Sequence, residues 1–209
     1  MGSNGSHTSP EVLGFLLRAN FCGSTAKRKK RNMIIQETSG GELPPKKPQN
    51  AVCVGVIDVG EAYGIDPGPD GRRMVPSSNK AHPEPKQKVR FIFESAEKME
   101  DGKPFQLTRQ FNVSLSDKGY LKPFLDGWGI ELVKTGGGID MEASCVGKCA
   151  KVNVTHDKDR NDPERIWANV STVMPSDEDL KPSGEFDKAD YLKKAAEKYA
   201  ERQSGGVPY

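Results

Sequence analysis

The stretch that decides the fold is Lys88-Val-Arg-Phe-Ile-Phe-Glu94, followed after a short loop by Phe105-Gln-Leu-Thr-Arg-Gln-Phe-Asn-Val-Ser-Leu115. In both segments large apolar residues alternate with polar ones, which is the period of a β-strand that covers a core with one face. The loop between them carries Asp101-Gly102, a pair that favours a tight turn. The sequence therefore predicts a β-hairpin over residues 88–115.

Three further strands are predicted on either side of this hairpin. Residues 51–59 form a strand that is apolar on both faces, with Val52, Val54 and Val56 on one of them. Residues 149–156 and 166–174 alternate in the same way, and Pro175 ends the last strand. The long segment 64–85, rich in Gly, Pro, Ser and Asn, is predicted to be a mobile loop.

A helix is predicted between the third and fourth strands. Ser116 and Asp117 offer N-cap side chains. Pro123 is tolerated only in the first turn of a helix, so the helix is expected to begin near Gly119 or Tyr120. The residues that recur at the spacing of one helical face are Tyr120, Leu121, Phe124, Leu125 and Trp128. A single helical turn is expected over residues 139–144.

The order of the predicted elements specifies the fold class. Three strands, a helix and two further strands within about 125 residues are typical of the OB-fold, a partly open five-stranded Greek-key barrel in which the helix plugs one end. We therefore predict a mainly β protein with an OB-fold-like domain over residues 51–175. Residues 176–209 are expected to form an acidic linker and an amphipathic helix over 187–202, which either packs on the barrel or binds a partner.

The charge of the chain is concentrated at its N-terminus. The whole chain has 31 basic and 29 acidic residues, whereas residues 1–50 hold 8 basic and 3 acidic ones. Residues 51–174 hold 17 basic and 18 acidic residues, a net charge of −1. Residues 1–50 contain few large apolar side chains and are predicted to be a disordered extension.

The run Lys27-Arg-Lys-Lys-Arg31 has two interpretations. It has the composition of an arm that binds nucleic acid or phosphate. Lysine and arginine codons are also purine-rich, so a translated ribosome-binding site upstream of Met33 would give the same run in a bacterial or phage gene. In that case residues 1–32 are an artefact of an upstream start.

Enzyme motifs are absent from the sequence. There is no Walker A motif, GxGxxG unit, HExxH or GxSxG, so we predict neither an enzyme nor a bound cofactor. Cys145 and Cys149 with His156 offer three zinc ligands without a fourth, and Asp157, Asp159 and Asp162 lack the glycine and terminal glutamate of a calcium loop. We therefore predict no metal site. No stretch approaches the 18 consecutive apolar residues of a membrane span.

Nucleic-acid binding fits the residue pattern best. Lys86, Lys88 and Arg90 follow one another at period two, so their side chains are expected on one face of the second strand. Arg109 interrupts the apolar register of the third strand, where a buried charge is costly, so a bulge or an exposed groove position is expected. The full predicted interface comprises Arg72, Arg73, Lys86, Lys88, Arg90, Arg109, Lys151 and Trp167. In the alternative interpretation these residues bind no nucleic acid. The cations then belong to an ordinary strand face in contact with solvent, and Trp167 lies at the seam of the barrel.

Four stretches resemble a family of small proteins encoded by bacteriophages and prophages. They begin at Lys88 (Lys-Val-Arg-Phe-Ile-Phe-Glu), Phe111 (Phe-Asn-Val-Ser-Leu-Ser-Asp-Lys), Gly147 (Gly-Lys-Cys-Ala-Lys-Val-Asn-Val-Thr-His-Asp-Lys) and Trp167 (Trp-Ala-Asn-Val-Ser-Thr-Val-Met-Pro). These proteins are similar to phage OB-fold single-stranded DNA-binding proteins of replication and recombination. The resemblance covers about 125 residues, excludes the first 32 and brings no catalytic motif with it.

Two functions follow as hypotheses. The first is sequence-tolerant binding of single-stranded DNA in phage replication or recombination, in the cytoplasm of a host bacterial cell. Phage or host replication proteins would then contact the C-terminal tail, and self-association is left open. The second is an OB-like module for protein interaction alone, which the net charge of −1 over residues 51–174 favours.

Overall fold

A computed structural model describes residues 42–77, 79, 81–158, 164 and 166–204. The chain divides into two units, residues 1–39 and 40–209, and all described residues belong to the second. Most of the predicted disordered extension, including the basic run at 27–31, lies outside the described residues. The first strand begins at Pro48, three residues before the predicted domain boundary.

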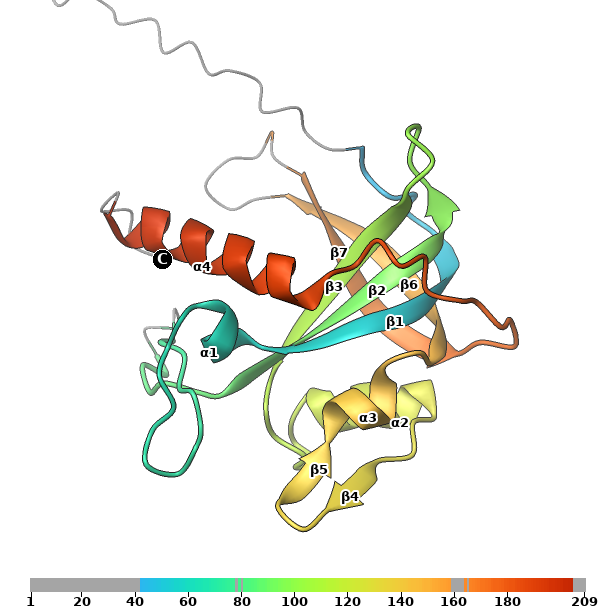
Figure 1. The fold of residues 1–209 in the computed structure, drawn as a ribbon. Coiled ribbons are helices and arrows are strands. Elements are labelled where there is room, and N and C mark those ends of the chain that lie inside the picture. Colours follow the sequence, from blue (N-terminus) through green and yellow to red (C-terminus); the bar gives the residue numbers. More distant parts are fainter. Residues whose placement is uncertain (1–41, 78, 80, 159–163, 165, 205–209) are drawn as a thin grey trace, which may run out of the picture. The chain divides into compact units, whose positions relative to one another are not determined.

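The described chain is mainly β (Figure 1). Its elements are β1 (Pro48–Asp58), α1 (Val59–Ala62), β2 (Lys88–Lys98), β3 (Pro104–Asn112), α2 (Leu121–Trp128), β4 (Val133–Thr135), β5 (Gly138–Asp140), α3 (Met141–Cys145), β6 (Cys149–Lys158), β7 (Ile166–Pro175) and α4 (Lys188–Ser204). The predicted hairpin, the helix after it, the two later strands and the C-terminal helix are all confirmed. The helix α1 and the short β4–β5 pair were not predicted.

Five strands form one antiparallel sheet in the order β3-β2-β1-β6-β7. The central strand β1 pairs with both β2 and β6. Within the described chain no ladder of hydrogen bonds joins the edge strands β3 and β7, so the sheet is not closed. Closure into a barrel stays a prediction.

The inner face of the sheet is filled by aromatic rings from β2, β3 and α2. The ring of Phe124 lies 5.4 Å from that of Phe91, 4.6 Å from that of Phe111 and 6.2 Å from that of Trp128, measured between centroids. The indole of Trp128 also donates a hydrogen bond to the carbonyl of Cys149, at 2.8 Å. Helix α2 thereby fastens the hairpin to β6, whereas its role as the plug of a closed barrel stays a prediction.

A β-bulge in β1 changes which of its residues face the core. The pairing with β2 shifts between Cys53 and Gly55, so one extra residue stands on the β1 side. As a result Val56 joins Ala51 and Cys53 in the inner core, whereas Ile57 belongs to a second cluster on the other face. The simple alternation predicted for Val52, Val54 and Val56 is therefore wrong, although the strand is apolar on both faces as expected.

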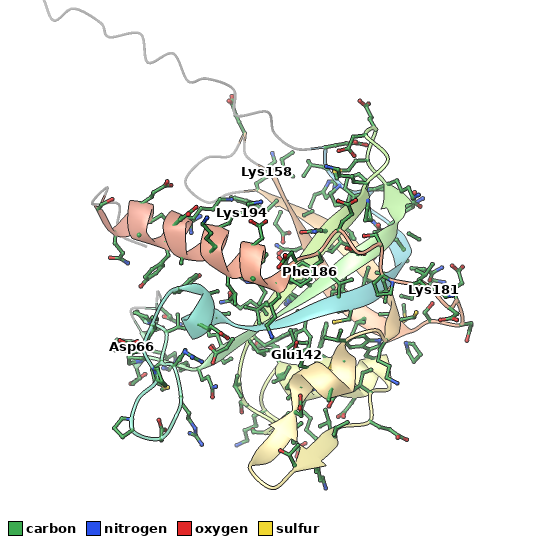
Figure 2. All side chains as sticks on the ribbon, in the orientation of Figure 1. Asp66, Glu142, Lys158, Lys181, Phe186 and Lys194 are labelled. Carbon is green, nitrogen blue, oxygen red and sulfur yellow. The ribbon has the colours of Figure 1, made fainter. Side chains whose placement is uncertain are left out.

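Helix α4 lies along the outer face of the sheet, on the side away from α2 and α3 (Figure 1). Its residues Tyr191, Leu192 and Ala195 pack against the second cluster, which contains Ile92 of β2. Phe186, just before α4, lies against the sheet (Figure 2), and a Cβ at Gly55 would come within 2.6 Å of its ring. Glycine at this position lets Phe186 approach the strand. The tail helix therefore packs on the sheet.

None of the helices in the described segments is long and apolar enough to cross a membrane.

One residue of the predicted helical face is placed differently. Leu121, Phe124, Leu125 and Trp128 are buried as expected, but Tyr120 is 85% exposed. Helix α2 begins at Leu121, so Tyr120 is its N-cap residue and its side chain does not follow the helical face.

We predict that Phe124→Ala lowers the free energy of unfolding by about 3–5 kcal/mol, because it removes the ring at the centre of the aromatic core. Tyr120→Ala is the matched control and should change that free energy by less than about 0.5 kcal/mol. Urea unfolding followed by tryptophan fluorescence measures both values. Equal losses in the two variants would contradict the placement of these two aromatic rings.

Candidate nucleic-acid interface

Two adjoining grooves lie where β3 ends and the chain turns toward α2. They share Asn112 and Ser114, and their volumes are about 370 and 500 Å³. We call them together the basic β3 surface. The residues that line it are Arg72, Met74, Pro85, Lys86, Gln87, Lys88, Arg109, Gln110, Phe111, Asn112, Val113, Ser114, Lys118, Gly119 and Tyr120.

The basic β3 surface carries five positive charges. They belong to Arg72, Lys86, Lys88, Arg109 and Lys118, and no carboxylate is among the described residues that line the two grooves. Arg72 has an exposed ion pair with Asp70 at 3.7 Å. The other four cations make no ion pair within the described part of the chain. The surface therefore has a local positive charge that the near-neutral total conceals.

Lys86 and Lys88 are two residues apart, and backbone pairing fixes both of them, Lys86 to Val75 and Lys88 to Asn112. Lys86 exchanges two backbone hydrogen bonds with Val75, each 3.0 Å long, and this bridge fixes the predicted mobile loop next to the start of β2. Partial burial and the charge of Lys86 both lower the pKa of Lys88. The lowered pKa of Lys88 thus reflects first the partial burial of its ammonium group and second the repulsion by Lys86, and an anion in the groove would oppose both effects.

Arg109 occupies a groove position and not a bulge. It pairs with Phe91 in an unbroken stretch of the β2–β3 ladder. Its guanidinium carbon lies 5.5 Å from the centroid of the Phe111 ring, a cation–π contact. Its Nε atom is buried and has no hydrogen-bond acceptor among the described residues. An N–H donor without an acceptor is therefore left at the edge of the aromatic core, on a residue that lines the first groove.

Tyr120 adds an aromatic ring to this surface. Its 85% exposure is the largest of any exposed large hydrophobic residue in the described chain, and it lines the same groove as Lys88 and Arg109. Met74 and Val113, both more than 40% exposed, line the second groove. Neither Tyr120 nor Lys118 was predicted as a site residue. The sequence signal that could have identified Tyr120 is its position before Pro123, close to the helix start.

A third groove, which we call the α4 groove, lies between α4 and the outer face of β2 and β3. Its volume is about 380 Å³, and its lining residues are Tyr63, Arg90, Gln106, Tyr191, Lys194, Ala195, Lys198, Tyr199 and Arg202. Arg90 donates hydrogen bonds to the hydroxyl of Tyr191 at 2.7 Å and to the amide oxygen of Gln110 at 2.8 Å. Burial opposes its charge, but the contacts with Tyr191 and Tyr63 outweigh that effect and raise the pKa of Arg90.

The predicted interface residues are therefore divided among several places. Arg72, Lys86, Lys88 and Arg109 come together on the basic β3 surface, while Arg90 belongs to the α4 groove. The other three residues line none of these grooves: Arg73 pairs with Asp58 at 3.8 Å, and Lys151 and Trp167 are exposed on β6 and β7. We expected Lys86, Lys88 and Arg90 to form one continuous surface. Helix α4 covers Arg90 and separates it from the two lysines.

The cysteines and histidine considered as zinc ligands have other partners. Cys145 is buried in the core, Cys149 Sγ accepts a hydrogen bond from the backbone NH of Leu180, and His156 Nε2 lies 2.8 Å from the carbonyl of Pro44. No group of three His, Cys, Asp or Glu side chains that could hold a metal ion occurs in the described segments.

Comparisons with protein families, with curated proteins and with solved structures found no match to this chain.

Thiol chemistry tests the burial of the cysteines. Burial raises the pKa values of Cys53 and Cys145 to about 12, so both thiols stay protonated at pH 8. We predict that neither reacts with a thiol reagent until the protein unfolds, whereas the half-buried Cys149 reacts in the native state. Because the folded state holds these two protons more tightly than the unfolded state, stability should fall as pH rises from about 9 toward 12.

Mass spectrometry after pulse labelling identifies which cysteines react, and urea titrations at several pH values measure the loss of stability. Rapid native labelling of Cys53 or Cys145 would contradict the structure of the core.

Proposed function

We propose that the protein binds single-stranded DNA without sequence preference, as a protein of phage replication or recombination. The observation that carries the proposal is the basic β3 surface, where five cations line two adjoining grooves and no carboxylate is among the described lining residues. The resemblance to phage single-stranded DNA-binding proteins supplies the biological setting. The order β3-β2-β1-β6-β7 agrees with an OB-fold-like barrel, whose second and third strands form its usual binding face.

The chemistry of the surface favours a single strand. Binding without sequence preference combines cations that follow the phosphates with aromatic rings on which unpaired bases stack. Lys86, Lys88 and Lys118 would contact phosphates, and the exposed ring of Tyr120 would stack on a base. Duplex DNA does not offer the faces of its bases, so Tyr120 would add nothing to its binding. The guanidinium of Arg109, which lines the first groove, would donate to a phosphate or a base.

A protein-interaction module without nucleic-acid binding is the second candidate. The net charge of −1 over residues 51–174 favours it, because dedicated nucleic-acid-binding domains are often basic overall. The first candidate requires the basic β3 surface to bind oligonucleotides, and the second does not. A binding module for protein would show no affinity for oligonucleotides at low salt.

Fluorescence polarisation with labelled oligo-dT and with duplex DNA across a salt series decides between them. We expect tight, salt-sensitive binding of oligo-dT and weaker binding of the duplex. The double variant Lys88→Glu with Lys118→Glu should weaken dT binding at least about tenfold and reduce the slope of log K against log salt by about 1 or more.

Tyr120→Ala should weaken dT binding by about 1–3 kcal/mol and leave the binding of duplex DNA unaffected, because only unpaired bases can stack on the ring.

The matched control is Lys134→Glu with Lys158→Glu, which makes the same change in net charge on two exposed residues that line none of the three grooves. It should bind dT within about twofold of the wild type. Absence of dT binding by the wild type at low salt would exclude the proposal. Equal weakening in the two double variants would mean that the interface lies elsewhere.

A further inference from the structure

The α4 groove contains a row of cations that the tail helix supplies. Lys194, Lys198 and Arg202 lie four residues apart on α4 and line the groove together with Arg90 from β2. Lys194 pairs with Asp190 at 2.7 Å, but Lys198 and Arg202 have no ion pair with any described carboxylate. No acidic residue is found among the described residues that line this groove. The acidic residues of α4 are thus placed outside it.

The shape of this row suits an extended anion. Each four-residue step along an α-helix advances about 6 Å, so the three cations of α4 span about 12 Å. A single phosphate or a compact anion is bound by donors that converge on one point. A row of this length matches a chain of phosphates, in which each charge contacts a different phosphate group.

Aromatic rings accompany the row. Tyr63 and Tyr199 stack with their centroids 4.3 Å apart and their planes at 7°, and Tyr191 lies against Arg90 in the same groove. Cations along a groove with tyrosines beside them are the combination that binds single strands. The tail helix therefore carries the same chemistry as the basic β3 surface.

Arg90 joins the two regions. Its guanidinium lines the α4 groove and donates a hydrogen bond to Gln110, which lines the basic β3 surface. Lys88 and Arg90 are two residues apart on β2, which places their backbones about 7 Å from each other. The cations thus continue from one region into the next along the outer side of the hairpin.

We infer that α4 is one wall of the nucleic-acid site, and that a bound single strand continues from the basic β3 surface into the α4 groove, with its phosphates on Lys198 and Arg202. This inference rests on the proposed function and extends it. It gives the C-terminal helix a direct role in binding DNA, in place of the recruitment of replication proteins that an acidic tail suggests. It also predicts that the length of DNA bound depends on α4.

The test compares Lys198→Glu with Lys193→Glu in the full chain. Both substitutions reverse the charge of an exposed lysine on α4, but Lys193 lies outside the groove. Fluorescence polarisation would measure the affinities of oligo-dT of about 4 and about 16 nucleotides, the range of site sizes of one OB-fold. Circular dichroism checks that both variants keep the helix.

If α4 is a wall of the site, Lys198→Glu weakens binding of the long oligonucleotide about tenfold, with little effect on the short one, and Lys193→Glu stays within about twofold of the wild type. If the wild type binds dT but the two variants behave alike, the inference is wrong while the proposed function stands. If the wild type does not bind dT, the proposed function is wrong and the inference falls with it.

Discussion

The packing of Phe124 among the rings of β2, β3 and α2 is the contact on which the rest of the structure depends. The Phe124 ring contacts the rings of Phe91, Phe93, Phe111 and Trp128. These contacts attach α2 to the inner face of the β2–β3 hairpin. Once that face is filled by aromatic rings, the charged residues of the same strands have to lie on the outer face or at its edge. The location of the cations is therefore a consequence of the core.

The outer face is occupied as well, and this determines the form of the candidate site. Two contacts hold the C-terminal segment along the sheet. The ring of Phe186 packs on Gly55, and the hydroxyl of Tyr191 accepts a hydrogen bond from Arg90. An open strand face would offer a flat surface to a ligand. With α4 beside it, the same face becomes a groove whose cations come from two elements far apart in the sequence.

The sequence predicted the fold better than the site. The hairpin, the buried face of α2 and the C-terminal helix were predictable because each depends on local periodicity. The β1 bulge between Cys53 and Gly55 was not, because a bulge adds a residue that no alternation of apolar residues reveals. Tyr120 fits the helical spacing, but α2 begins one residue later, at Leu121, so the ring of Tyr120 is not on the buried face of the helix. The separation of Arg90 from Lys88 depends on the docking of α4, a long-range contact that no local pattern encodes.

The central claim is that a single strand follows the outer side of the β2–β3 hairpin between Tyr120 and α4. Photo-crosslinking of oligo-dT in which 5-iododeoxyuridine replaces single thymidines, followed by peptide mass spectrometry, measures that path most directly. The account predicts crosslinks to Tyr120 from one end of the oligonucleotide and to Tyr63 or Tyr199 from the other. Crosslinks confined to Trp167 and its neighbours on β7 would contradict it.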